Sequence, residues 1–367
     1  LENSAEGKLV KGIDVYPVTN LKELVFHLAG SKKITPLPKE NILQNLDRAY
    51  DVDFSDVKGQ PVARRALEIA AAGGHSILLM GAPGCGKTML ARRLVTILPP
   101  VTEAEALEIT KIYSIVNMLP HAESVMVERP FRSPHHSASA SALLGGGTYP
   151  RPGEVTLSHN GVLFLDELPE FERHALEMLR QPLEDGEVSI SRVRGSVTFP
   201  SKFLLVAAQN PCPCGFLGDK TKRCVCKQKE IDSYRRKISG PLLDRIDMQI
   251  NLKRVEYSEL KSKAVGECSA AIRQRVVKAR NVQLERFAGS NIYCNAQMTR
   301  REVAKYCALD DEAQAVLGKY FNVLHLSARS HDRILKVART IADLSGSERI
   351  TSTHIAEAIQ LRTSVNG

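Results

Sequence analysis

The feature that most constrains the fold of this 367-residue chain is a glycine-rich run, Gly81-Ala82-Pro83-Gly84-Cys85-Gly86-Lys87-Thr88. The run matches the phosphate-binding P-loop pattern, and it follows an apolar stretch at 77–80 that predicts a buried strand. Residues 89–95 have the pattern of a helix start. In this setting backbone amides face phosphates, Lys87 reaches the terminal phosphates and the Thr88 hydroxyl coordinates magnesium. The flanking strand and helix favour a site for ATP and Mg²⁺ over a chance glycine-rich turn.

A second apolar strand is predicted at 161–165, and it ends in Asp166 and Glu167. This arrangement is typical of a Walker B element, in which Asp166 holds the magnesium ion, directly or through water, and Glu167 polarises the attacking water. An acidic pair after a strand is also common in solvated turns. Because a P-loop is present in the same chain, we predict a catalytic pair and an ATP-hydrolysing enzyme.

Composition narrows the class of protein further. The 50 Lys and Arg residues exceed the 41 Asp and Glu residues, and the resulting net charge of +9 is compatible with a polyanionic partner. No apolar run is long enough to span a membrane, so we expect no membrane partner. The eight cysteines, one of them inside the P-loop, favour a reducing compartment, and we expect a cytoplasmic protein. The chain begins at Leu1, and we interpret it as a fragment or a processed form.

The order of predicted elements divides the chain into parts. Strands and helices alternate between residues 40 and 252, which predicts an α/β fold with a parallel sheet covered by helices on both faces. Within it, the Gly-, Ser-, Pro- and His-rich segment 129–160 is expected to be irregular, one helix is expected at 171–183, and 187–199 alternates as a β-hairpin with a basic tip. Another helix is expected to begin at Thr102, with Glu105 three positions on in the pattern of a capping box. The predicted parts are a tail and linker at 1–38, an ATPase domain at 39–253, a helical insert or linker at 254–297 and a helical lid at 298–367.

Four cysteines form two tight pairs, Cys212 with Cys214 and Cys224 with Cys226, on either side of a short basic loop. Four thiolates at this spacing can hold a zinc ion tetrahedrally, and we predict a zinc site. One residue separates the cysteines of each pair, whereas zinc ribbons usually have two. An unmetallated or disulfide-prone loop therefore stays an alternative.

The P-loop and the acidic strand belong to an ordered set of motifs that includes residues 129–136 (RPFRSPHH), 210–215 (NPCPCG) and 240–247 (GPLLDRID). Over nearly the whole chain, this set resembles the ComM/YifB family of bacterial magnesium-chelatase-like AAA+ ATPases. The resemblance implies an AAA+ P-loop fold with β-hairpin insertions and a C-terminal α-helical lid. It also implies that residues 1–38 end an upstream Lon-like domain, and that the protein is a hexameric helicase that migrates branched DNA in recombination and natural transformation.

The resemblance assigns roles to single residues in this chain. Asn210 matches sensor 1, an amide that orients the hydrolytic water, and Arg245 matches the arginine finger that reaches the nucleotide of a neighbouring subunit. Arg329 matches sensor 2 at the start of a lid helix, and Arg333, one turn on, competes for that role. Outside this context an arginine is more often a solvated residue or a salt-bridge partner.

The predicted hairpin is the candidate DNA contact. Arg192 and Arg194 at its tip offer charge for a phosphate backbone but no geometry for reading bases. The alternative is an exposed hairpin whose arginines only keep a sheet edge soluble. His135 and His136 are open between nucleic-acid contacts, metal ligands and ordinary loop histidines. The basic residues of the cysteine loop either add to DNA binding or are solvated; they are Lys220, Lys222, Arg223, Lys227 and Lys229.

We therefore expect an ATP-driven hexameric DNA motor, a helicase or branch-migration translocase that acts on single-stranded or branched DNA without sequence preference. A magnesium-chelatase motor subunit, which drives metal insertion into a porphyrin, is the alternative with the same architecture. The expected Lon-like remnant and the cysteine cluster favour DNA. A sigma-contacting transcription activator would need a GAFTGA-type loop, which the sequence lacks. A non-catalytic scaffold is disfavoured by Lys87, Asp166, Glu167 and Arg245.

Overall fold

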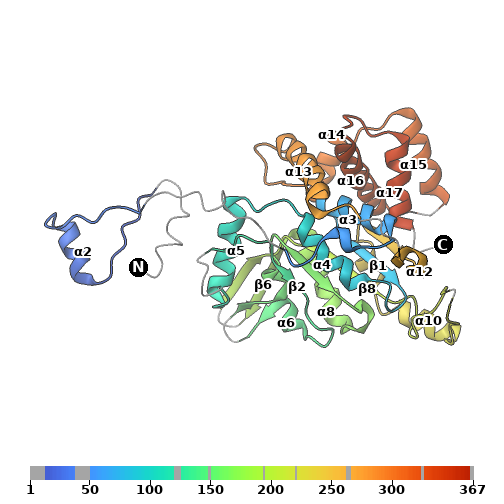
Figure 1. Ribbon diagram of the computed structural model, residues 1–367, viewed down its shortest axis with the longest axis horizontal. Coiled ribbons are helices and arrows are strands. Elements are labelled where there is room, and N and C mark those ends of the chain that lie inside the picture. Colours follow the sequence, from blue (N-terminus) through green and yellow to red (C-terminus); the bar gives the residue numbers. More distant parts are fainter. Residues whose placement is uncertain are drawn as a thin grey trace. The chain divides into compact units, whose positions relative to one another are not determined.

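The computed structural model describes residues 13–37, 50–119, 125–147, 150–192, 195–219, 221–261, 266–323 and 326–363 (Figure 1). The chain divides into two compact units. The smaller consists of Leu1–Ala49 and Pro100–Arg129, and the larger of Tyr50–Pro99 and Pro130–Gly367. Within the described ranges, every helix is too short or too polar to cross a membrane.

The larger unit is built on a five-stranded sheet in which all paired strands are parallel. Its strands are short runs of apolar residues, as expected for a parallel sheet that is buried on both faces. Leu79, in the strand that precedes the P-loop, pairs with Ala208 on one side and Ile250 on the other. In spatial order the strands are β2 (Phe131–Arg132), β5 (Val162–Leu165), β8 (Leu204–Gln209), β1 (Ile77–Gly81) and β9 (Met248–Leu252).

Helices cover both faces of this sheet because alternate side chains of each strand enter two different cores. Ile77 and Leu79 pack with α3, α4 and the C-terminal helices, whereas Leu78 packs with α6, α7, α8, α11 and a β-hairpin. The predicted α/β fold with two covered faces is confirmed. The helices named here are α3 (Pro61–Gly73), α4 (Lys87–Ile97), α6 (Ala140–Leu144), α7 (Glu154–Leu157), α8 (Arg173–Met178) and α11 (Gly240–Leu243).

A C-terminal helical region follows the last strand, as predicted (Figure 1). Helices α13 and α16 contact α3, and α17 contacts β9, so this region shares a core with one face of the sheet. Asp343 of α16 is buried and binds Arg286 of α13, with Nη1 to Oδ2 at 2.8 Å. The helices are α12 (Tyr257–Lys261), α13 (Ser269–Arg286), α14 (Arg300–Tyr306), α15 (Asp311–Val323), α16 (Ala328–Ser345) and α17 (Ser352–Thr363).

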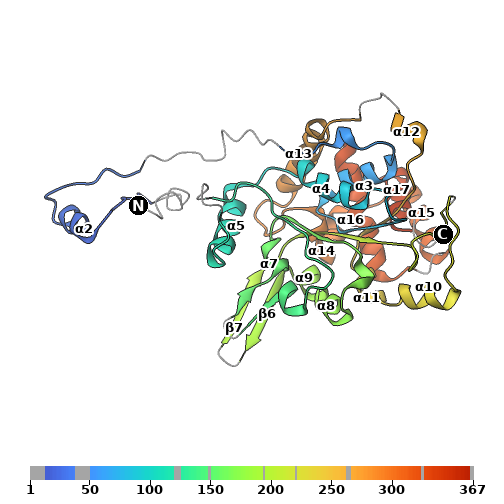
Figure 2. The ribbon, with the colours of Figure 1, turned by 60° about the horizontal axis from the view of Figure 1, so that its bottom comes forward.

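Two antiparallel hairpins interrupt the α/β order. The longer joins β6 (Glu187–Arg192) and β7 (Gly195–Pro200) and projects from the larger unit (Figure 2). Val188 and Phe199 are buried in the same core as one face of the sheet, whereas most of β7 is exposed. The hairpin lies where the sequence predicts it. The shorter joins β3 (Gly145–Gly146) and β4 (Arg151–Pro152).

Two segments differ from the sequence-based expectation. The segment 129–160, expected to be irregular, contains the edge strand β2, the short helices α6 and α7, and the shorter hairpin. The single helix expected at 171–183 is divided into α8 and α9 (Arg180–Asp185). A further helix, α10 (Gln228–Arg235), follows the cysteine loop, and single 3-10 turns lie at Phe54–Asp56, Leu168–Glu170 and Asn295–Gln297.

The described part of the smaller unit contains the helices α2 and α5. α2 (Leu21–Leu28) begins after Asn20, whose side chain caps the first turn. α5 (Glu103–Ile115) begins with the predicted capping box, in which the side chains of Thr102 and Glu105 each bind the backbone of the other.

Candidate nucleotide-hydrolysis site

The P-loop connects β1 to α4 at the carboxyl edge of the parallel sheet. Gly84 and Gly86 have φ values of +80° and +94°, which L side chains rarely adopt. At Gly81 an added Cβ would lie 2.7 Å from Cys85 Sγ and 2.9 Å from the Leu252 carbonyl oxygen. The loop therefore needs glycine at these positions to curl tightly against β9 and to turn its amides toward a ligand.

Lys87, the first residue of α4, folds back over the loop. Its Nζ donates to the carbonyl oxygen of Gly81 at 2.7 Å and to Oδ1 of Asn210 at 3.0 Å. Asn210 directly follows β8, the strand that neighbours β1. The structure thus brings the P-loop lysine and the predicted sensor 1 amide into contact.

Thr88 and Asp166 form the second contact at this edge. Thr88 Oγ1 donates to Asp166 Oδ2 at 2.8 Å, although the two residues follow strands that are not adjacent in the sheet. A hydroxyl and a carboxylate are oxygen ligands of the kind that Mg²⁺ prefers. Thr88 and Asp166 would hold a magnesium ion, which would offset the negative charge of a nucleotide at the P-loop.

Glu167 is half exposed and has a left-handed backbone, with φ at +52°. Non-glycine residues rarely adopt this conformation, which clusters at functional sites. The Glu167 N–H donates to Asp166 Oδ1 at 2.9 Å, and Glu167 Oε2 lies 3.3 Å from His136 Nδ1. His136 follows the edge strand β2, and its ring lies edge-on to that of Phe171. The sequence left the role of His136 open. Its position after the edge strand β2 is what brings it next to Glu167.

The predicted finger, Arg245, lies after α11 and is only 7% exposed. Its Nη1 donates to the Pro241 carbonyl oxygen at 2.9 Å, and its Nη2 forms an ion pair with Glu184 of α9. Its Nε is buried without a hydrogen-bond partner among the described residues. Burial acts to raise the pKa of Glu184, but the hydrogen bond and charge of Arg245 hold it below its ordinary value.

The two candidates for sensor 2 have different surroundings. Arg329 is 58% exposed, and its Nη2 lies 3.7 Å from the second oxygen of Glu184. Arg333 instead forms an ion pair with the buried carboxylate of Asp247. Arg245 and Arg329 therefore share one carboxylate, and in the described part of the chain no hydrogen bond or ion pair connects them with Lys87.

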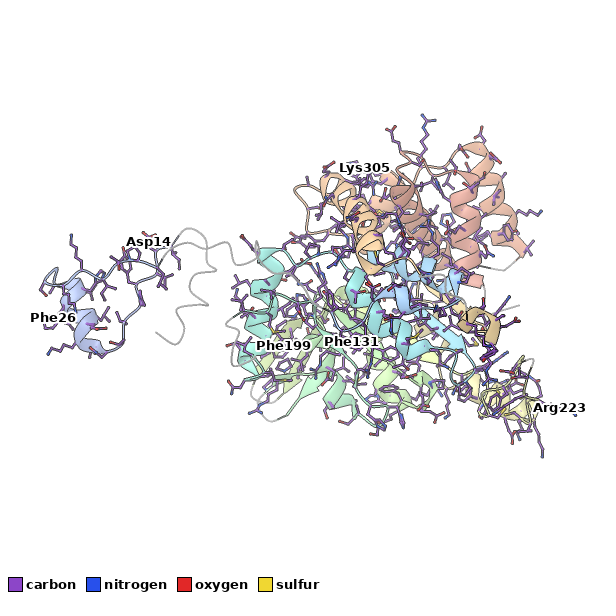
Figure 3. All side chains as sticks on the ribbon, viewed as in Figure 1. Asp14, Phe26, Phe131, Phe199, Arg223 and Lys305 are labelled. Atoms are coloured by element: carbon purple, nitrogen blue, oxygen red, sulfur yellow. The ribbon has the colours of Figure 1, made fainter. Side chains whose placement is uncertain are left out.

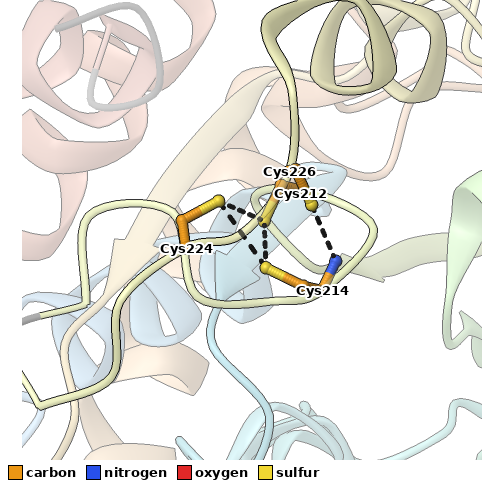
Figure 4. A group of neighbouring side chains, drawn as sticks. All are labelled: Cys212, Cys214, Cys224 and Cys226. Carbon is orange, nitrogen blue, oxygen red and sulfur yellow. Dashed lines mark hydrogen bonds between the residues drawn. The ribbon is translucent and has the colours of Figure 1, made fainter.

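The predicted zinc ligands gather into one cluster after β8 (Figure 4). All four sulfur atoms lie within 4.8 Å of one another. Cys212 Sγ is 3.4 Å from Cys214 Sγ and 3.7 Å from Cys224 Sγ. Backbone N–H groups of Phe216 and Val225 lower the pKa of Cys214 to about 6, which favours the thiolate. Four thiols that converge in this way fit a zinc ion.

The cysteine cluster is packed against the nucleotide site. Gly215 has a φ of +83°, and a Cβ there would lie 2.6 Å from Cδ of Pro83 in the P-loop. The backbone of Asn210 hydrogen-bonds the side chain of Tyr234 in α10, and burial raises the pKa of Tyr234 to about 12. The loop that follows the first cysteine pair extends to the periphery, where Figure 3 labels Arg223.

The structure describes the two predicted DNA contacts, Arg192 and Arg194, only in part. Arg192 ends β6, where its backbone pairs with Gly195, but its side chain lies outside the described residues. Arg194 lies wholly outside them.

Comparison with known proteins agrees with this arrangement. Residues 53–260 match the family described as magnesium chelatase, subunit ChlI, and residues 266–362 match the C-terminal region of that subunit. The chain is 44% identical to the competence protein ComM of Haemophilus influenzae over 368 residues, which cover 99% of this chain and 71% of ComM. It is 43% identical to YifB of Escherichia coli, over 98% of this chain and 70% of YifB.

A more distant relative is the magnesium-chelatase 38 kDa subunit of Rhodobacter capsulatus, which is 26% identical over 176 residues, or 43% of this chain and 50% of that subunit. The family match covers both the sheet with its P-loop and the C-terminal helices. This chain therefore belongs to the magnesium chelatase ChlI family of AAA+ ATPases.

Proposed function

We propose that this chain is an ATP-driven DNA motor that assembles as a hexameric ring and acts on single-stranded or branched DNA. ATP hydrolysis is supported by two hydrogen bonds at one edge of the sheet. One joins Lys87 to Asn210, and the other joins Thr88 to Asp166. The DNA part rests on similarity to a protein named for competence.

In the proposed mechanism, the P-loop amides and Lys87 bind the phosphates of ATP. Thr88 and Asp166 hold Mg²⁺, which when bound supplies positive charge to the phosphates. Glu167 accepts a proton from the attacking water, and Asn210 orients that water toward the terminal phosphate. The hydrogen bond from Lys87 Nζ to Asn210 Oδ1 supports this assignment, because it brings the two side chains to the same point at the sheet edge.

We further propose that Arg245 and Arg329 act together on the nucleotide of a neighbouring subunit. Two guanidinium groups share the single carboxylate of Glu184, which leaves excess positive charge. A triphosphate carries the opposite charge, and arginines that contact the transferring phosphoryl group raise hydrolysis rates by roughly a thousandfold or more. Arg245 must leave Glu184 to do this.

The four-cysteine cluster is proposed to hold one zinc ion. Zinc would fix the loop that begins directly after Asn210 and packs against Pro83. Elemental analysis of protein purified without added metal should give about one zinc per chain. Replacement of Cys224 and Cys226 by Ser should release the metal and impair hydrolysis more than initial ATP binding. A metal-free protein with full activity under reducing conditions would contradict the assignment.

The DNA proposal is tested by ATP hydrolysis rates measured without polymer, with single-stranded DNA, with forked DNA and with four-way junctions. We expect stimulation that falls steeply with salt and varies little with sequence. The alternative is a chelatase motor, suggested by the relative from Rhodobacter capsulatus. It predicts no DNA response and a response to a porphyrin-binding partner protein. Equal rates with and without every DNA would contradict the proposal.

A further inference from the structure

A buried polar cluster lies directly after Arg245 and is not used by the proposed chemistry. Its centre is the carboxylate of Asp247, which is 5% exposed. Oδ2 accepts hydrogen bonds from Ser76 N at 3.1 Å and from Ser76 Oγ at 3.3 Å. Arg333 of α16 forms an ion pair with Oδ1, and His75 Nδ1 lies 3.4 Å from Oδ2. The sheet and the C-terminal helices thus bind the same carboxylate.

The main chain at 245–247 is held from both sides. Arg362 of α17, which is 6% exposed, donates from Nη1 to the carbonyl oxygens of Ile246 at 2.7 Å and Asp247 at 3.2 Å. Ser76 Oγ accepts a hydrogen bond from Asp247 N at 3.0 Å, and the Arg245 carbonyl oxygen, at 3.2 Å, competes with Asp247 Oδ2 for its single proton. The backbone of the predicted finger is therefore bound to the residue that precedes β1, and the next two residues are bound to a C-terminal helix.

Movement of the C-terminal helices should be transmitted through this cluster to residues 245–247, because its buried polar groups have few other hydrogen-bond partners. A buried carboxylate cannot exchange Arg333 for water without a large desolvation cost. Helix α16 also binds the sheet through His75, whose Nε2 lies 2.7 Å from Thr340 Oγ1. If α16 and α17 shift relative to the sheet, the segment at 245–247 is drawn with them.

We propose that Asp247 is a positioning residue that makes the reach of Arg245 depend on the position of helices α16 and α17. This inference rests on the proposed action of Arg245 in a neighbouring subunit. Asp247 touches no nucleotide in this account. It connects the position of the C-terminal helices with hydrolysis at the next site around a ring.

The test uses Asp247→Asn in the full chain, with Asp343→Asn as a matched control. Asp343 is also a buried carboxylate of the helical region, with Arg286 and Arg339 as partners. In the described part of the chain no hydrogen bond or ion pair joins it directly to residues 245–247, although Asn295, Thr340 and His75 connect it with Asp247 indirectly. We expect Asp247→Asn to lower kcat at least tenfold while the Kd for a fluorescent ATP analogue changes less than twofold. Asp343→Asn should keep kcat within twofold per folded molecule.

Recovery of ATPase activity in mixed rings distinguishes a misplaced finger from a general structural defect, because a subunit with a general defect would not regain activity. A Lys87→Ala subunit has a normal finger but no working P-loop, whereas an Asp247→Asn subunit has an intact P-loop. Mixing the two variants should therefore restore ATP hydrolysis at Asp247→Asn P-loops that face the finger of a Lys87→Ala subunit. If Asp247→Asn is insoluble, Arg362→Lys, which keeps the charge but loses the forked contact, should show the same pattern in weaker form.

Three results would overturn the inference. One is a folded Asp247→Asn protein with normal kcat, and another is an equal loss of kcat in Asp343→Asn. The third is no recovery with Lys87→Ala under conditions in which Arg245→Ala does recover. If Arg245→Ala also fails to recover despite mixed assembly, the proposed action between subunits fails instead, and the inference falls with it.

Discussion

Replacement of Glu184 by Gln is expected to release Arg245. The change keeps the size of the side chain but removes the charge that binds Arg245 and faces Arg329. Arg245 is 7% exposed, whereas Glu184 is 49% exposed, so the ion pair is intermediate between a buried and a surface pair. Surface pairs contribute up to about 1 kcal/mol, and loss of one partner of a buried pair costs roughly 3–5 kcal/mol.

We therefore expect Glu184→Gln to lower the free energy of unfolding by about 1–3 kcal/mol. The same loss favours the extended form of Arg245 by roughly 5- to 150-fold. Urea denaturation measures the first quantity, and the kcat of ATP hydrolysis by the assembled protein, which should rise several-fold, reports the second. Glu177→Gln is the matched control, because Glu177 forms a partly exposed pair with Arg180 at 3.0 Å within one helical turn.

The pH dependence supplies a second check. The pKa of Glu184 is lowered in the folded protein from an ordinary value of 4.5, so its carboxylate stabilises the fold above that pH. This stabilisation is lost as pH falls through the lowered pKa, and the difference between wild type and Glu184→Gln should shrink below about pH 4.5. Unchanged stability and unchanged kcat in Glu184→Gln would refute the view that this carboxylate restrains the finger.

Three further changes test the rest of the site. Glu167→Gln should bind ATP normally but hydrolyse it about 10²–10⁴-fold more slowly, as measured by binding and single-turnover assays, and normal turnover would remove Glu167 from the mechanism. Gly215→Val should weaken ATP binding measured by titration, because its Cβ would meet Pro83, and tight binding would show that the loop yields freely. Replacing Arg192 and Arg194 together by Ala should lower DNA affinity and its salt dependence in anisotropy titrations while basal ATPase stays unchanged, and unaltered DNA stimulation would make the hairpin structural.

The fold and the centre of the candidate site follow from local sequence patterns. Apolar runs before the P-loop and before Asp166 predict buried strands, and the carboxyl ends of parallel strands lie along one edge of a sheet. To predict the contact of Lys87 with Asn210, one must also know that β1 and β8 are neighbours in the sheet. Strand order is set by long-range packing, which periodicity does not report.

The features of the site that the sequence did not predict depend on contacts between residues far apart in the chain. β2 has two residues, too few for an alternating pattern, and it places His136 beside Glu167. The ion pair between Arg245 and Glu184 depends on α9, which extends beyond residue 183, where the predicted helix ends. Ion-pair partners far apart in the chain leave no local signal, so the sequence identified the arginines but not the carboxylates that bind them.

The central claim is that ATP hydrolysis at the P-loop moves this protein along branched DNA. The most direct measurement follows a fluorescently labelled four-way junction incubated with the protein and ATP, with a non-hydrolysable analogue and Lys87→Ala as controls. We expect conversion of the junction into two duplex products with ATP and wild-type protein, and none with either control. A protein that binds the junction and hydrolyses ATP but leaves the junction intact would not be a branch-migration motor.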